Sequence, residues 1–103
     1  MLVYMRAEWA AACAEMERDV WTDARVIRRA RHFVLLKIDV SSADLEEDLY
    51  VQRYGARAIP SVVLFDVEGR RAGLISGRSD AEVLLRIMEE VLAMPGIEEK
   101  WES

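Results

Sequence analysis

Apolar and polar positions in the first half of the chain predict two strands with two helices between them. The apolar run from Leu2 to Arg6 has the length of a short buried strand. Residues 34–40 (VLLKIDV) are mostly apolar, which is typical of a strand in a parallel sheet. Apolar residues at helical spacing predict a helix over residues 10–20 and a shorter one over residues 23–31, capped by Thr22 or Asp23.

The second half of the chain predicts a helix, then a hairpin, then a long amphipathic helix. Ser41 or Ser42 is placed to cap a helix that ends at Tyr54, and Gly55 can take the left-handed conformation that stops it. The pattern after that helix predicts strands over residues 61–65 and 71–75, a glycine-containing turn over residues 66–69, a capping box over residues 79–82, and a helix that runs to about Ala93.

This order of elements predicts an α/β fold with a mixed central sheet of about four strands flanked by helices. Parallel strands connected by helices come first, and the hairpin adds antiparallel strands. We expect one domain over residues 1–93, followed by a polar tail over residues 94–103 that begins near Pro95-Gly96.

Composition is that of a globular domain and excludes several function classes. The chain has 103 residues, of which 52% are hydrophobic and 32% charged, and its net charge is −5. That charge argues against nucleic acid as a partner, because phosphate binding requires a basic surface. No apolar run is long enough to insert into a membrane, and no signal peptide is visible, although a domain of a longer exported protein would look the same.

A single cysteine, Cys13, excludes an internal disulfide and a multi-cysteine metal site, and we expect no metal and no cofactor. The one basic cluster alternates with apolar residues at helical spacing, so we interpret it as the solvated face of a helix. Its members are Arg25, Arg28, Arg29, Arg31 and His32.

Two short motifs stand in front of predicted elements and carry a resemblance. Ala7-Glu8-Trp9 follows the first strand and precedes the helix that holds Cys13, and Ile59-Pro60 precedes the hairpin. In this arrangement the chain resembles the thioredoxin superfamily over roughly residues 2–92. The stretch from Cys13 to Val26 most resembles the periplasmic C-terminal domain of DsbD-type thiol:disulfide interchange proteins, which relay electrons between protein dithiols.

The resemblance implies a site in which the attacking cysteine is missing. The family motif is Cys-x-x-Cys, and this chain has Ala10-Ala11-Ala12-Cys13. By resemblance, Ala10 takes the nucleophile position and Cys13 the resolving position. Since one thiol cannot both attack a disulfide and resolve the mixed disulfide, we expect a redox-crippled thiol–disulfide oxidoreductase.

The same resemblance implies a cis Ile59–Pro60 peptide bond, with Trp9, Ala10 and Ile59 forming an apolar patch around Pro60. That patch would bind an extended segment of a partner protein. Two alternatives stay open for the function. One is a non-redox module that binds peptides in the cis-proline groove, and the other is a monothiol redox sensor based on Cys13.

Two further departures from the family concern the first strand and its neighbour. Tyr4 stands where thioredoxins often place a buried aspartate, and we expect its phenol to pack and to make one hydrogen bond. The family also has an earlier strand that pairs with the one corresponding to Val34–Val40. Without it, this strand would be an open apolar edge. We therefore expect upstream residues or a second copy to cover it. The resemblance implies a bacterial protein, which is periplasmic if the chain is a domain of a larger exported protein and cytoplasmic otherwise.

Overall fold

The fold is a single mixed sheet, seen in a computed structural model that describes residues 1–41 and 59–94. Within these residues the strand order is β2-β1-β3-β4. Strand β1 (Leu2–Arg6) is parallel to β2 (Leu35–Asp39) and antiparallel to β3 (Ser61–Phe65), and β3 is antiparallel to β4 (Arg71–Ser76). The predicted α/β class with a four-stranded mixed sheet is confirmed.

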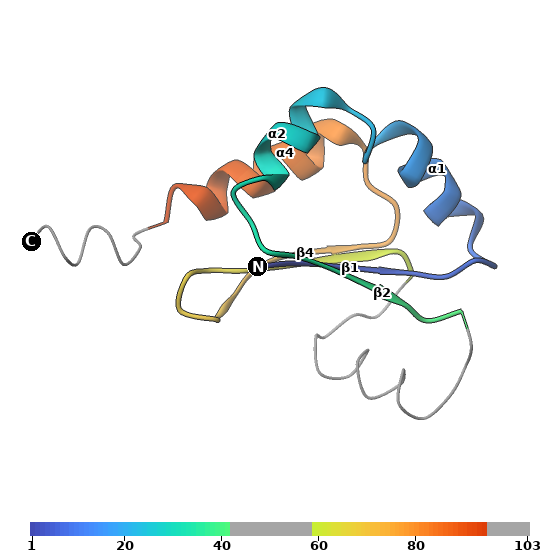
Figure 1. The fold of residues 1–103 in the computed structure, drawn as a ribbon, viewed down its shortest axis with the longest axis horizontal. Coiled ribbons are helices and arrows are strands. Elements are labelled where there is room, and N and C mark those ends of the chain that lie inside the picture. Colours follow the sequence, from blue (N-terminus) through green and yellow to red (C-terminus); the bar gives the residue numbers. More distant parts are fainter. Residues whose placement is uncertain (42–58, 95–103) are drawn as a thin grey trace, which may run out of the picture.

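The helices of the described residues lie on one face of this sheet (Figure 1). They are α1 (Ala11–Asp19), α2 (Ala24–Ala30) and α4 (Ala81–Leu92). Side chains alternate along a strand, so every second residue of β1 and β3 meets the helices. The main core lies between these layers, and its fully buried members include Leu2, Leu64, Met16, Val26, Leu84 and Met88.

The opposite face of the sheet has its own apolar cluster. Val3, Met5 and Val63 are fully buried there, and Ile38, Phe65 and Leu74 pack against them. Since Val3 and Met5 alternate with Leu2 and Tyr4, strand β1 is buried on both faces, which is what its continuous apolar run predicts.

Side-chain hydrogen bonds cap the first turns of α2 and α4, and one of the two predicted caps needs correction. Asp23 caps α2 by accepting from the backbone N–H of Arg25 at 2.9 Å, as predicted. The predicted capping box at Ser79 is wrong, because α4 is capped one residue later. The Asp80 carboxylate accepts from the Val83 N–H at 2.9 Å. Asp and Ser are about equally good caps, so sequence pattern alone does not choose between adjacent candidates.

Strand β2 is an edge of the sheet in the part of the chain that the structure describes. It pairs with β1 on one side only, and Val34, Leu35 and Leu36 are exposed. The predicted open apolar edge is therefore observed within residues 1–41 and 59–94. The predicted helix ending at Tyr54 and the stop at Pro95-Gly96 lie outside these residues. Of the described helices, none has the length and apolarity that crossing a bilayer requires.

Candidate functional site

The two motifs singled out by sequence reach the same end of the sheet. Met5 and Ser61 are directly paired in β1 and β3, which run antiparallel. The chain that leaves β1 toward Trp9 and Ala10 therefore starts beside the chain that enters β3 through Ile59 and Pro60. The Ile59–Pro60 peptide bond is cis, as expected. Gly77, with a φ of +86°, donates its N–H to the Pro60 carbonyl at 2.8 Å and fixes this turn against the end of β4.

Cys13 lies one turn inside α1 and is fully buried. Its N–H donates to the Ala10 carbonyl at 3.0 Å, and Ala10 is the N-cap residue, with extended backbone. A residue at an N-cap stands beside backbone N–H groups that have no partner within the helix. A thiol at position 10 would therefore meet a field that stabilises its thiolate, and Cys13 lies deeper, where its sulfur is closed to solvent.

Trp9 stands on the surface, with 66% of its side chain exposed. Its indole Nε1 donates to the Ser41 carbonyl at 3.2 Å, and the Glu8 N–H donates to the Ser41 hydroxyl at 2.8 Å. The Ser41 hydroxyl in turn donates to the Asp39 carboxylate. These bonds tie the loop before α1 to the end of β2, so the exposed indole is held in place. Ala10 and Ile59 are both partly buried.

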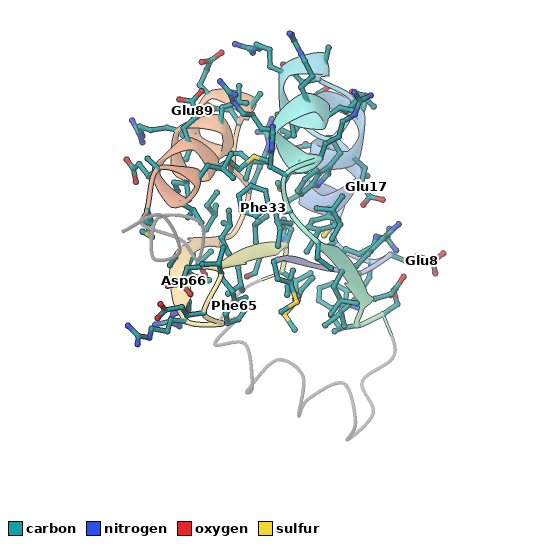
Figure 2. The ribbon with its side chains drawn as sticks, turned by 60° about the vertical axis from the view of Figure 1, so that its left-hand side comes forward. Glu8, Glu17, Phe33, Phe65, Asp66 and Glu89 are labelled. Carbon is teal, nitrogen blue, oxygen red and sulfur yellow. The ribbon has the colours of Figure 1, made fainter. Side chains whose placement is uncertain are left out.

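A cluster of polar side chains connects β1 to α1 beside Cys13, and its members are Tyr4, Arg6, Glu17 and Lys37. The Tyr4 hydroxyl donates to Glu17 Oε2 at 3.2 Å, and Arg6 Nε donates to the same oxygen at 3.1 Å. Lys37 Nζ lies 4.0 Å from the other carboxylate oxygen, so strand β2 also contributes a charge. In Figure 2, Glu17 projects from α1 on the side where β2 lies. Arg6 is shared with Asp39, whose Oδ2 lies 2.6 Å from Nη1.

Tyr4 is the group in this cluster whose ionisation the surroundings change most. Burial raises the pKa of its phenol well above the ordinary value, and the nearby Cys13 thiol and Glu17 carboxylate act in the same direction. Tyr4 is therefore neutral at physiological pH and serves as a hydrogen-bond donor. Its ring also packs on Trp21, with centroids 4.9 Å apart. The expectation that Tyr4 packs and makes one hydrogen bond agrees with this geometry.

Glu17 is a site residue that the sequence interpretation missed. Acidic residues on a helix usually belong to its solvated face, yet Glu17 is half-buried and contacts Tyr4, Arg6 and Lys37. One signal was available, because Glu17 follows Cys13 by four residues and so lies on the same face of the helix. Ser41 carried no comparable signal, since its contacts come from residues 32 and 33 positions earlier.

The basic cluster on α2 is a solvated face, as predicted. Arg25, Arg28, Arg29 and Arg86 line a groove of about 500 Å³ between α2 and α4. Arg25 pairs with Glu82 at 2.6 Å and Arg29 with Glu89 at 3.1 Å across that groove, so half of these charges are already matched. In residues 1–41 and 59–94, no three His, Cys, Asp or Glu side chains are grouped to hold a metal ion.

Known proteins resemble the chain in both sequence and structure. Residues 1–92 match the family model for a thioredoxin-like domain. The thiol:disulfide interchange protein DsbD of Ralstonia nicotianae is 32% identical over 87 residues, which cover 84% of this chain and 14% of that protein. DsbD of Yersinia pestis is 25% identical over 96 residues, covering 91% of this chain and 16% of that protein. The chain thus spans a small part of these curated relatives.

Two solved structures show the same fold. The C-terminal domain of DsbD from Neisseria meningitidis, in its reduced form, superposes with a TM-score of 0.77 at 21% identity, covering 88% of this chain and 79% of that one. A thioredoxin from Thermus thermophilus superposes with a TM-score of 0.75 at 22% identity, covering 89% of this chain and 72% of that one. The chain therefore belongs to the thioredoxin-like domain family and is related to DsbD-type thiol:disulfide interchange proteins.

Proposed function

We propose that this chain is a domain of the thiol:disulfide interchange type whose own dithiol chemistry is lost. Ala10 marks the position of the attacking cysteine, and Cys13 is the thiol that would resolve a mixed disulfide. The observation that carries the proposal is the burial of the chain's one cysteine inside α1, a turn beyond an alanine N-cap. With one thiol, the chain cannot pass two electrons by forming an internal disulfide.

The proposal predicts that a single substitution, Ala10→Cys, restores the chemistry. The new thiol would stand at the helix N-terminus, where the helix dipole lowers its pKa, and Cys13 would complete the Cys-x-x-Cys motif. We expect no insulin reduction by the natural sequence and clear turnover by Ala10→Cys. Ala11→Cys is the matched control, because it also adds a thiol to the first turn but gives the wrong spacing.

Three results would contradict this assignment. Turnover by the natural sequence well above buffer would show that the site is not crippled. Equal activity of Ala10→Cys and Ala11→Cys would show that position 10 has no special role. An inert but correctly folded Ala10→Cys protein, with no internal disulfide by mass spectrometry after oxidation, would favour a scaffold that was never an oxidoreductase.

A second candidate function is a peptide-binding module, and the exposure of Trp9 beside Ala10 favours it. An extended partner segment would add to the backbone just before Pro60, with Trp9 and Ile59 in contact with its side chains. Fluorescence of Trp9 on titration with an extended peptide tests this module. Trp9→Ala is expected to abolish the signal and the affinity together, and unchanged affinity measured with a labelled peptide would refute it.

The monothiol sensor is a third candidate, and the burial of Cys13 weighs against it. Alkylation of the folded protein decides the question, because a sensor cysteine must be reached by small oxidants. We expect labelling only after denaturant is added. Rapid labelling of the native state would overturn that expectation and restore the sensor.

Partner and compartment are part of the same proposal. The partner would be a protein that presents a thiol, a disulfide or an extended segment, and the relation to DsbD-type proteins favours the periplasm over the cytoplasm. The edge from Val34 to Val40 is proposed as a separate interaction surface, with a second copy of the chain as its partner. Residues 1–93 would form the domain and residues 94–103 a tail.

A further inference from the structure

The groove between α2 and α4 concentrates positive charge in a chain that is acidic as a whole. Four arginines and two glutamates line it, so its net charge is +2, whereas that of the whole chain is −5. Its volume of about 500 Å³ is within the range of ligand-binding clefts. None of its lining residues belongs to the site around Cys13 and Pro60, so the groove is a separate feature of the surface.

Two ion pairs span the groove and mark its ends. Nη1 of Arg25 lies 2.6 Å from Oε1 of Glu82, and Nη2 of Arg29 lies 3.1 Å from Oε1 of Glu89. The two glutamates are two helical turns apart on α4, which sets a groove length of about 10 Å. Both glutamates are exposed, and Figure 2 shows Glu89 in the helix layer on the side away from the sheet, so the groove opens to solvent.

Arg28 and Arg86 line the same groove and belong to neither ion pair. Both are exposed, and within residues 1–41 and 59–94 neither forms an ion pair or a side-chain hydrogen bond. Each lies between the two ion-paired residues of its own helix, so the middle of the groove has two guanidinium groups and no free carboxylate. Like charges gathered in one groove repel each other, and an anion bound between them would remove that repulsion.

We propose that this groove binds a short acidic segment of a partner protein, whose carboxylates are held by Arg28 and Arg86. A guanidinium group binds a carboxylate through two parallel N–H donors, which gives both affinity and direction. About three extended residues fill the length of the groove. The buried Leu85 and the aliphatic stems of the arginines contact the apolar atoms of that segment. This binding goes beyond the function proposed above and does not depend on it.

The distribution of charge along the groove favours a short acidic segment over a long polyanion. Unmatched positive charge is confined to the middle of the groove, because the ion pair at each end is neutral as a unit. A nucleic acid or an anionic membrane requires positive charge over a wider surface, and the net charge of −5 repels both. One or two carboxylates on a peptide match what the groove offers.

Fluorescence anisotropy of a labelled peptide tests the groove directly. The probe has two adjacent glutamates in a neutral frame of glycine and serine, and the control peptide has two glutamines in their place. We expect the natural chain to bind the glutamate peptide at least about tenfold more tightly, because the glutamines cannot form the charge-assisted hydrogen bonds. The affinity should fall as the salt concentration is raised, since salt screens exposed charges.

Substitutions of the two central arginines test whether the peptide binds in this groove. Arg28→Gln and Arg86→Gln should each weaken binding at least about fivefold, and the double variant should abolish it. Both side chains are exposed, so we expect every variant to keep the natural circular dichroism spectrum. Arg71→Gln on β4 is the matched control, because it removes the same charge from an exposed arginine outside the groove. A chain with Arg28→Glu and Arg86→Glu should instead bind a peptide with two lysines.

Four results would overturn the proposal. Equal affinity for the glutamate and glutamine peptides would show that the groove does not select acidic segments. Binding that survives the double glutamine variant would place the peptide elsewhere on the chain. Tighter binding of heparin or of phosphatidylglycerol vesicles, lost in the same double variant, would replace the peptide by a polyanion. Binding that appears only after Glu98→Gln and Glu99→Gln would replace the partner by the chain's own acidic residues.

Discussion

Tyr4 illustrates how one residue joins the fold to the chemistry of the site. It sits in a central strand, packs on Trp21 and donates to Glu17 in α1. Its phenol stays protonated because burial and the nearby Cys13 and Glu17 all oppose the phenolate. A tyrosine in this state can hold the helix that carries Cys13 in place, but it is a poor acceptor for a proton from that thiol.

The raised pKa of Tyr4 predicts a specific loss of stability in alkali. The folded state keeps the proton where the unfolded state, with a pKa near 10, begins to lose it. The contribution is therefore complete below about pH 10 and is lost as pH rises toward the folded-state pKa. Tyr4→Phe should cost about 1 kcal/mol at neutral pH through the lost hydrogen bond. Above pH 10, the free energy of unfolding of Tyr4→Phe, measured with denaturant, should fall less steeply with pH than that of the natural chain. Equal slopes of the two proteins would contradict the assignment.

Residues that act through long-range contacts were the hardest to predict. Cys13 and Pro60 were recognisable because each belongs to a short motif beside an element boundary. Glu17 was not, because Arg6 and Lys37 lie 11 and 20 positions away on two strands. Sequence spacing places a side chain on a helix face, but only the packing of that helix decides which strand residues it meets.

At the scale of elements, the hydrophobic pattern predicted strands and helices closely, because all of the described elements except β2 have buried residues. Strand β1 was expected over Leu2–Arg6 and is found there, and α4 was expected to end near Ala93 and ends at Leu92. The start of α4 was misplaced by one residue. Caps depend on a single hydrogen bond, and Ser79 and Asp80 both offer a suitable oxygen.

Substitution at Asp80 distinguishes the observed cap from the predicted one. Asp80→Ala leaves the Val83 N–H without its partner and should lower the free energy of unfolding by about 1 kcal/mol. Asp80→Asn retains a side-chain oxygen at the same place and should keep most of the stability. Thermal or urea denaturation measures both variants. If the two lose the same amount, charge and not capping is the contribution of Asp80.

At the scale of the whole molecule, the central strands β1 and β3 carry two cores. Their residues alternate between the helix layer and the opposite cluster, so both cores depend on the same backbone. Met88 fills the first and Met5 the second, and both are fully buried. A domain of this size has about 5–15 kcal/mol of stability, which leaves little room for losses on both faces.

Met5→Ala and Met88→Ala should each cost about 2–5 kcal/mol, because each leaves a cavity in a packed core. The two side chains lie on opposite faces of the sheet, so their effects should add, and the double variant should be largely unfolded. Urea denaturation followed by both circular dichroism and tryptophan fluorescence measures this. Coincident transitions in each single variant are expected, since both faces share β1 and β3. Separate transitions would show that the two cores unfold independently, and a double variant as stable as either single one would show that they are not both required.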